Sequence, residues 1–560
     1  MRRLSERRLK TLFFAVSAAV YIAVGYWLQV RHGFILGDSL ARVAASQSAL
    51  FSREPHLAAI GFIFTPLTAL VQLPLIALSP LWPALTERAF AASVMSAIFM
   101  AGAVVQILSM GIDRGLPRWF GVGVATLFAI HPMIVFYGSN GMSEAPFIFF
   151  MTWAVRRLLL WMVDDDVHHL IVAGGIAMGL AYLTRYDALA CIAAAGALVA
   201  ITTYRRASSP PRVRRAILDL VIISGPGSLA FVGWAIASWL ITGEGFAQFT
   251  SEYGNKAILE QSGATAPGLF PGLGFAIVCT LLLAPTLIPL GAWAGFLRWR
   301  RPRMSMLVPP VVIFGAALAF QALTFAVGGT FAFLRFYIVA IPFAATLALL
   351  AVPDGAFVAA VRPGRHALGP SSVPSTRSVG GRPAYPAVVA LFAVSVAVAG
   401  WGMSLPHYAP QEYALGAVLN PDPDSVSPRK SVEHRIARTF STERQLARYL
   451  DELDLPPSSV LADTVYGFDV IAASHKPKTF VLPSDPDFVR ILNDPSARGA
   501  KYLLAVPATG RGISDTLNKR YPTLYDDGAE IATLELEVPN DGDAQPNWRL
   551  YRVNEPVPVA

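Results

Sequence analysis

The chain has 560 residues, of which 54% are hydrophobic and only 15% are charged. A soluble domain usually carries about 25% charged residues, so this composition excludes an ordinary soluble protein. Apolar runs of about twenty residues recur from Thr11 to Leu405, and each is long enough to cross a hydrocarbon layer of roughly 30 Å. These features predict a polytopic α-helical membrane protein.

The net charge of +8 is distributed unevenly along the chain. Residues 1–404 contain 29 of the 45 Lys and Arg residues but only 15 of the 37 Asp and Glu residues. The basic excess therefore belongs to the membrane half, where it indicates orientation and not nucleic-acid binding. The two cysteines, Cys191 and Cys279, lie in apolar runs, and we expect both to be packing residues.

The apolar runs predict eleven membrane spans. The first follows a basic N-terminus like that of a signal peptide, but its length and the lack of a convincing cleavage site favour a retained span. With the N-terminus in the cytoplasm, 20 of the 29 basic residues of the membrane half fall in cytoplasmic segments, as the positive-inside rule requires. The C-terminal residues are then extracytoplasmic, and the protein is expected in the plasma membrane. The spans are placed at residues 11–29, 84–110, 119–137, 144–163, 169–184, 187–203, 216–242, 271–297, 305–327, 335–352 and 385–404.

Four connecting segments need their own interpretation. Residues 57–80 are apolar but interrupted by prolines; one span here would invert the downstream charge pattern, so we expect interfacial helices, or else an even number of short passes. Residues 38–53 are expected to form a helix on the membrane surface. The loop 243–268 is too long for a simple connection and is expected to cover a site. Residues 353–384 are rich in Pro, Gly, Ser and Arg, which predicts flexibility.

The polar tail predicts a small domain of its own. Ser441–Leu453 has helical spacing, and residues 533–537 alternate as an edge or half-exposed strand does. The tail shows no glycine-rich phosphate loop, nucleophile elbow or metal-ligand cluster. We therefore divide the chain into a membrane module, residues 1–404, and an α/β domain, residues 405–560. Further strands are expected at 459–462, 478–481 and 502–506, with helices near 486–494 and 512–520.

Asp38 lies just beyond the first predicted span, and two interpretations of it stand. Asp38 or Ser39 can cap a following helix, or the Asp38 carboxylate can act as a general base for an acceptor hydroxyl. A more conspicuous acidic segment, Asp164-Asp165-Asp166-Val167-His168-His169, has the residue types of a metal site. Because the topology places it in a short cytoplasmic loop, we interpret it as a solvated connector.

Two later turns carry ionisable residues on the same predicted side as Asp38. Glu144 follows Ser143 at the start of a span, where it suits the helix dipole, but it can also bind a sugar hydroxyl or organise Arg185. Arg185 and Asp187 interrupt an apolar stretch; they can simply pair, yet ionisable residues at this depth are functional candidates.

Arg335 begins an otherwise apolar span on the same predicted side. Its planar guanidinium matches a phosphate group bidentately. The alternative is an arginine that reaches to the membrane interface without a ligand. We favour the phosphate role.

Together these residues resemble the GT-C superfamily of polyprenyl-phosphate-sugar glycosyltransferases. The resemblance covers roughly residues 1–404, with the tail similar to the variable extracytoplasmic domains of these enzymes. The Ala- and Arg-rich composition is similar to that of actinobacterial members, such as mycobacterial mannosyl- or arabinosyltransferases. One feature departs from the pattern, since Ser39-Leu40 stands where a second acid commonly follows the first catalytic Asp. The resemblance rests on Asp38 with its amphipathic juxtamembrane segments, the Ser143-Glu144 turn, the Thr184-Arg185-Tyr186-Asp187 turn and the Arg335-Phe336…Pro342 segment.

The resemblance implies transfer of a sugar from a polyprenyl-phosphate donor to an envelope glycan, glycolipid or protein on the outer face, with inversion. Asp38 would deprotonate or orient the acceptor hydroxyl, and Arg335, helped by Arg185, would neutralise the departing lipid phosphate. The transition state would resemble an oxocarbenium ion. No metal motif stands on the predicted outer face, so we expect neither a metal nor another cofactor; the lipid-linked sugar is a substrate. Substrate contacts are expected from Glu144, Asp187, Tyr186 and Tyr337.

Other functions predict different sequence features. A transporter or flippase of lipid-linked glycans would need polar residues near mid-membrane or a repeat between halves, and a membrane transferase of phosphoethanolamine or acyl groups would need a nucleophile or a metal cluster. A non-catalytic scaffold that binds the cell wall would depend on residues 405–560 and not on Asp38. The sequence favours the glycosyltransferase.

Overall fold

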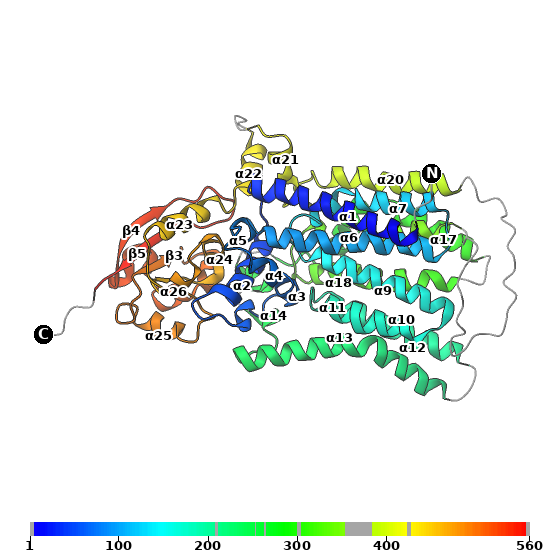
Figure 1. Ribbon diagram of the computed structural model, residues 1–560, viewed down its shortest axis with the longest axis horizontal. Helices are drawn as coiled ribbons and strands as arrows, with labels where there is room; N and C mark the ends of the chain where they lie inside the picture. The colour runs from blue at the N-terminus through cyan, green and yellow to red at the C-terminus, as the bar shows by residue number, and fades with distance from the viewer. Residues whose placement is uncertain are drawn as a thin grey trace.

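The computed structural model describes residues 5–207, 211–251, 254–261, 265–299, 304–352, 384–422 and 427–555. Figure 1 shows an elongated molecule in which long helices run side by side and the C-terminal sheet lies at the end opposite the N-terminus. We call the end of the helix bundle nearest this sheet the sheet end, and the other the N-terminal end. The predicted flexible segment 353–384 lies outside the described residues except for Ala384.

Each predicted span coincides with helical structure. Within the described residues, seven helices are long and apolar enough to cross a membrane singly, and a bent pair can form an eighth span. Three predicted spans correspond to shorter apolar helices: Arg118–Ala129, Val167–Tyr182 and Leu334–Leu350. The protein is a polytopic α-helical membrane protein. The long helices are α1 with η1 (Glu6–Arg31), α6 (Phe90–Asp113), α9 (Glu144–Asp164), α12 (Ala188–Arg206), α13 (Arg212–Thr242), α18 (Val308–Ala326) and α20 (Ala384–Gly402).

Several predicted spans are interrupted, mostly at prolines. The predicted span 271–297 is two helices, α16 (Leu269–Leu283) and α17 (Leu287–Trp299), bent by 80° at a break that contains Pro285. Proline lacks the amide hydrogen that a continuous helix needs. The other interrupted segments comprise α7 (Arg118–Ala129) and α8 (Pro132–Tyr137), α10 (Val167–Ile171), η3 (Val172–Met178) and α11 (Gly179–Tyr182), and η5 (Leu334–Tyr337) and α19 (Ala340–Leu350).

The first connecting loop forms a layer of short helices at the sheet end. Residues 57–80 contain no long helix, in agreement with the expectation that they do not form one span. The expectation of a membrane-surface helix at 38–53 was wrong in one respect, because nine of the fifteen residues of α2 (Gly37–Phe51) are buried. The remaining helices of the layer are η2 (Leu57–Ile60), α3 (Leu67–Leu70), α4 (Leu73–Ile76) and α5 (Ala84–Glu87).

The tail folds around a five-stranded mixed sheet of order β2-β1-β3-β5-β4. β1 pairs in parallel with β2 and β3, and β5 pairs antiparallel with β3 and β4. Alternate residues of a strand face opposite sides, so Val460 joins the core beneath α23 and α24 whereas Leu461 joins the core beneath α25 and α26. The elements are β1 (Val460–Leu461), β2 (Phe480–Val481), β3 (Tyr502–Ala505), β4 (Ala532–Val538), β5 (Trp548–Val553), α23 (Ser441–Glu452), α24 (Thr464–Ala473), α25 (Phe488–Asn493) and α26 (Thr516–Arg520).

Most elements predicted in the tail are present, but one strand and four α-helices were missed. The predictions near 441–453, 459–462, 478–481, 502–506 and 533–537 each coincide with an element of the predicted type. β5 was not predicted, although it pairs with both β3 and β4. The domain boundary at residue 405 stays a prediction. The missed α-helices are α21 (Gly416–Leu419), α22 (Pro428–Ala437), α24 and α27 (Leu524–Asp527).

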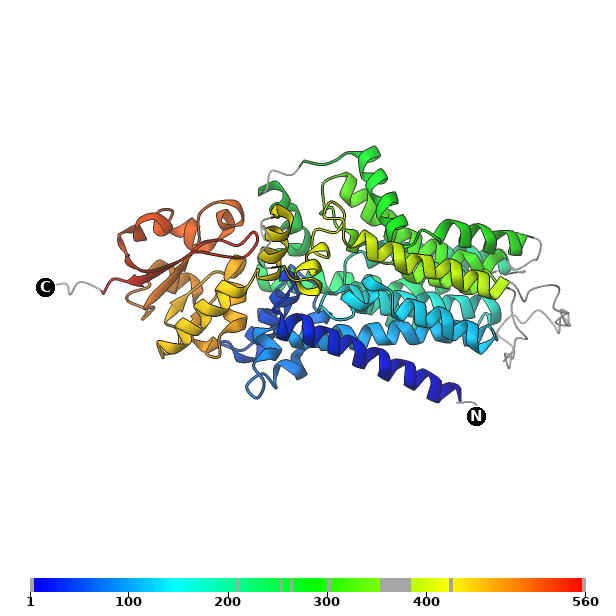
Figure 2. The ribbon, with the colours of Figure 1, turned by 90° about the horizontal axis from the view of Figure 1, so that it is seen from above.

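The loop layer connects the bundle to the sheet domain (Figures 1 and 2). Gln47 of α2 donates to the carbonyl oxygen of Ser474 at 3.5 Å. Arg53, just beyond α2, donates to Asp487 at 2.9 Å and to Asp485 at 3.2 Å. The first residues of α2 therefore lie at the helix bundle, and its later residues contact the sheet domain.

Candidate active site

Asp38 lies in the first turn of α2, at the sheet end of the bundle. Leu36 occupies the N-cap position, and no side chain makes the capping hydrogen bond. The proposed capping role of Asp38 or Ser39 is therefore not what the structure shows. Arg42, one turn later, donates from Nη1 to the Asp38 carbonyl oxygen at 3.0 Å, which is the contact expected between residues i and i+4 of a helix.

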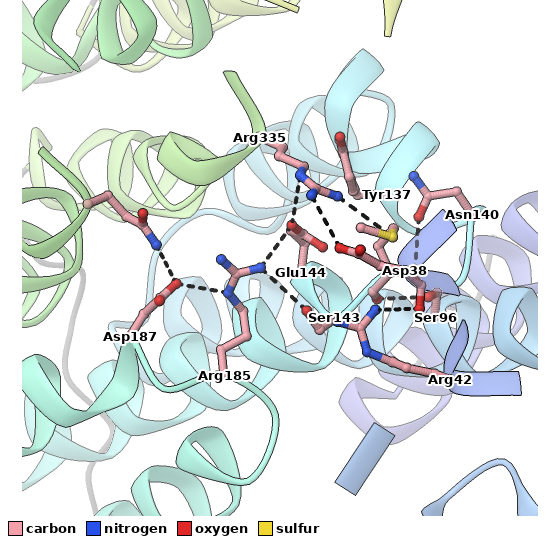
Figure 3. Close-up of polar contacts among 12 residues, drawn as sticks. Asp38, Arg42, Ser96, Tyr137, Asn140, Ser143, Glu144, Arg185, Asp187 and Arg335 are labelled. Carbon is pink, nitrogen blue, oxygen red and sulfur yellow. Dashed lines mark hydrogen bonds and ion pairs between the residues drawn. The ribbon is translucent and has the colours of Figure 1, made fainter. Parts of the chain in front are cut away.

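Arg335 links Asp38 to Glu144 (Figure 3). Its Nη2 lies 3.3 Å from Asp38 Oδ2, and its Nε lies 3.8 Å from Glu144 Oε1. The 3₁₀ helix η5 carries this arginine immediately before α19. Arg335 thus bridges a carboxylate of the loop layer and a carboxylate at the start of α9.

Glu144 also binds Arg185, which extends the cluster to a third carboxylate (Figure 3). Arg185 Nη1 lies 2.9 Å from Glu144 Oε1, and its Nε lies 2.8 Å from Asp187 Oδ2. Gln321 of α18 donates to the same Asp187 oxygen at 2.6 Å. Arg185 and Asp187 do pair with each other, as the simpler interpretation expected, but within a larger network.

The turn between α8 and α9 packs against the start of α2 and contacts Arg185 of this network. Gly141 has a φ of +81°, and a β-carbon there would lie 2.1 Å from Ser39 Oγ and 2.5 Å from the Ala92 β-carbon. Only glycine fits a position with this backbone and this spacing. Ser143, at the N-cap of α9, makes no side-chain cap, and its Oγ instead accepts from Arg185 Nη1 at 3.3 Å.

The carboxylates of the cluster differ in exposure. The side chain of Asp38 is 40% exposed, whereas those of Glu144 and Asp187 are 1% and 4% exposed. Burial of the carboxyl would raise the pKa of Asp38, but the guanidinium groups of Arg335 and Arg42 outweigh it and lower that pKa below its usual value. Asp38 is therefore the ionised carboxylate that a molecule from outside can reach.

The whole chain aligns with solved membrane-protein structures. ArnT from Cupriavidus metallidurans bound to undecaprenyl phosphate matches with a TM-score of 0.54 and 14% identity, covering 98% of each chain. The apo structure of that protein matches with a TM-score of 0.53 and 14% identity over 97% of each chain. The chain has the GT-C fold.

A third match has a lower score. The archaeal oligosaccharyltransferase AglB from Archaeoglobus fulgidus, in complex with an inhibitory peptide and a dolichol-phosphate, gives a TM-score of 0.40 at 11% identity over 99% of this chain and 75% of that chain. No protein-family profile and no curated protein sequence matches the chain. The GT-C fold expected from the sequence is confirmed, and the mycobacterial subtype stays a prediction.

The structure of this GT-C protein brings five of the seven predicted site residues into one network: Asp38, Glu144, Arg185, Asp187 and Arg335. The two tyrosines have aromatic neighbours instead. Tyr186 packs against Phe249 and Phe320, at ring distances of 5.6 and 6.4 Å. Tyr337 is buried, with its ring 6.3 Å from that of Phe275. Their substrate contacts stay predictions.

Sequence reasoning missed two members of the site. Arg42 was considered part of a surface helix, although its position four residues after Asp38 could have indicated a partner. It is buried and lies 4.4 Å from the centre of the Phe64 ring. Gln321 lies within an apolar span, and the only feature that could have identified it was its polar side chain at membrane depth.

The acidic segment 164–169 has partners that account for it. Asp166 accepts from the backbone of His168 and caps α10, and Asp164 Oδ2 lies 3.0 Å from His169 Nε2. Asp165 lies 2.8 Å from Arg215. Among the residues that the structure describes, no group of three or more His, Cys, Asp or Glu side chains is arranged to hold a metal ion. The interpretation of this segment as a connector is consistent with these contacts.

Cys191 and Cys279 are both buried and neither forms a disulfide bond, as expected.

Proposed function

We propose that the protein is a glycosyltransferase that moves a sugar from a polyprenyl-phosphate donor to an acceptor hydroxyl at the sheet end of the bundle. The observation that carries the proposal is the contact between Asp38, 40% exposed, and Arg335, 6% exposed. A reachable carboxylate beside a buried guanidinium provides a base for the acceptor and a cation for a lipid phosphate. The GT-C fold supports this assignment.

Asp38 is proposed as the general base. Its lowered pKa keeps the carboxylate ionised at neutral pH, so it can accept the proton of the acceptor hydroxyl as the oxygen attacks the anomeric carbon. Glu144 and Asp187 are unsuited to this step, because each is buried and already bound to Arg185. They are proposed to position the arginines and to contact the sugar.

Arg335 is proposed to bind the donor phosphate, with Arg185 beside it. As the acceptor oxygen bonds to the anomeric carbon, the bond from that carbon to the phosphate oxygen breaks, and polyprenyl phosphate leaves with the electron pair. A guanidinium neutralises the leaving oxygens without exchanging a proton. Attack from the face opposite the phosphate inverts the anomeric configuration.

The orientation and the chemical partners belong to the same proposal. The sheet end is taken as the extracytoplasmic side because 20 of the 29 basic residues in the membrane half lie in the segments predicted to face the cytoplasm. Mannosyl or arabinosyl transfer to an envelope glycan or glycolipid is the proposed specificity. Transfer is proposed to need no metal, and full activity after chelation by EDTA would support that part.

The test is sugar transfer by the purified protein in nanodiscs. A panel of polyprenyl-phosphate sugars is offered with candidate acceptors, and both glycosidic product and released polyprenyl phosphate are measured for wild type and Arg335→Ala. We expect one donor to be consumed by wild type and to be consumed far more slowly by the variant. Donor binding without product would instead favour a transporter or a scaffold.

A further inference from the structure

Two arginines from different parts of the chain meet beside Gly33, just beyond the first span. Arg88 lies between α5 and α6, and Arg444 lies in the first turn of α23 in the sheet domain. Gly33 follows η1, whose last residue, Arg31, ends the first candidate span. Membrane module, loop layer and sheet domain therefore meet at one point.

Arg444 is buried without full compensation of its charge. The residue is 7% exposed, and its Nη1 has no hydrogen-bond partner among the residues that the structure describes. The neighbouring Glu443 is engaged elsewhere, since its Oε1 accepts from the Trp548 indole at 3.0 Å. Burial, together with the nearby Arg88, lowers the pKa of Arg444 to about 10. Glu87 and Glu443 offset this effect only in part. A buried guanidinium N–H without an acceptor is costly, so an anionic oxygen that reached Arg444 would be stabilising.

Arg88 directs a guanidinium nitrogen toward the same place. Its Nε pairs with Glu87 Oε1 at 3.4 Å, whereas its Nη1 faces Gly33. A β-carbon on Gly33 would lie 3.3 Å from Arg88 Nη1 and 3.2 Å from Arg444 Nη2. An anionic oxygen near this point could accept from both, because charge-assisted N–H···O bonds measure about 2.7–2.9 Å.

Gly33 lets both guanidinium groups come close to the backbone. Its φ of +70° is a conformation that other residues rarely adopt. A β-carbon here would be crowded by both guanidinium groups. Gly33 therefore allows both the turn after the first span and the close approach of Arg88 and Arg444. We call these three residues the cradle.

The cradle lies at the level of the membrane surface. Trp27, six residues earlier, and Trp82, six residues before Arg88, are 37% and 44% exposed, and tryptophan gathers at membrane interfaces. Leu81 is 85% exposed, as expected for a side chain that contacts lipid. A ligand at Gly33 can thus keep its acyl chains in the bilayer.

We propose that Arg88, Arg444 and Gly33 form a binding site for the phosphate of an anionic lipid headgroup, separate from the donor site at Arg335. The bound headgroup would join the first span to the sheet domain. It would also brace the short segment from Gly33 to Gly37 that leads to Asp38. A β-carbon built on Gly37 would lie 3.6 Å from the ring of Phe440, four residues before Arg444.

The test compares thermal unfolding of the full-length protein in phosphatidylcholine nanodiscs with and without phosphatidylglycerol. We expect the anionic lipid to raise the Tm of wild type by roughly 2–4 °C. Arg444→Gln should lose this increment, and retention of phosphatidylglycerol in native mass spectrometry should fall about five-fold. In phosphatidylcholine alone, Arg444→Gln should be at least as stable as wild type, because it removes an unpaired buried charge.

Three controls make the result decisive. Arg490→Gln removes an exposed arginine of α25 and should keep the full increment. Arg88→Gln should lose it, as Arg444→Gln does. Inorganic phosphate in phosphatidylcholine nanodiscs should give little stabilisation. An equal lipid increment in all variants, or the same increment from inorganic phosphate, would overturn the proposal, as would an Arg444→Gln protein destabilised in both lipids.

Discussion

The two ends of α9 each carry an acidic residue cluster, and the comparison shows what distinguishes a candidate site from a connector. α9 is 21 residues long, about 31 Å at 1.5 Å per residue. At the sheet end Glu144 is 1% exposed and lies between two arginines from distant segments. At the N-terminal end Asp164 is 25% exposed and pairs with His169, five residues away. Local contacts and one ion pair, between Asp165 and Arg215, account for the second cluster, whereas the first assembles four distant segments around a reachable carboxylate.

The largest expected effect is that of Asp38→Asn. An amide cannot accept the acceptor proton, so transfer should fall by about 10²–10⁴-fold. Asp166→Asn, at the other end of α9, should leave transfer unchanged, because Asp166 caps α10. Both rates are measured as product formed per mole of protein in nanodiscs. Equal losses in the two variants would remove the distinction between the two ends.

Arg335→Lys should have the next largest effect. Lysine keeps the charge but loses the planar fork that matches a phosphate, and kcat/KM should fall by roughly 10²-fold. The matched control is Arg156→Lys, since Arg156 also pairs with a carboxylate, Asp113, at 2.6 Å. A larger loss in the control would contradict the phosphate role of Arg335.

Glu144→Gln should affect stability and positioning together. The change leaves Arg185 and Arg335 short of a negative partner, and removing one member of a buried ion pair costs about 3–5 kcal/mol. We expect a lower Tm and a KM for the donor that rises more than kcat falls. Asp165→Asn, which affects a pair with Arg215 at the other end, should lower the Tm less. Unchanged donor KM in Glu144→Gln would indicate a purely structural cluster.

The smallest effect is a difference in pH dependence between Asp38 and Asp515 of the sheet domain. The lowered pKa of Asp38 gives stability that is complete above about pH 4 and is lost as pH falls through its folded pKa. Burial, together with Asp463, raises the pKa of Asp515 to about 8, so stability should instead decline as pH rises from about 4 to 8. Asp515→Asn should flatten that decline in fluorescence-monitored unfolding of the full-length protein; an unaltered slope would contradict the assignment.

The helices and most of the sheet domain could be predicted because hydrophobic length and alternation are local properties of the sequence. β5 was missed although Trp548, Leu550 and Tyr551 are buried in it, because a short alternating run with two arginines has a weak signal. The site was predictable in part, since isolated charges at span ends are visible in sequence. Gln321 was not identified, because only tertiary packing brings α18 to Asp187. Arg42 was overlooked although it follows Asp38 by four residues in the same helix.

Breaks in the helices also escaped prediction. The left-handed conformation of Ala89, with φ of +51°, separates α5 from α6 inside the predicted span 84–110, whose only charged residues are Glu87 and Arg88. Burial of α2 was missed for a related reason, since its covering surface comes from α24, more than 400 residues later in the chain. Such long-range contacts leave no periodic trace.

The most direct test of the central claim is to measure polyprenyl-phosphate affinity and sugar transfer on the same nanodisc samples of wild type and Asp38→Asn. Because Asp38 pairs with Arg335, neutralising Asp38 should free the guanidinium and leave binding as tight as in wild type or tighter, while transfer is lost. Wild-type transfer by Asp38→Asn, or loss of binding in parallel with transfer, would contradict the roles given to these two residues.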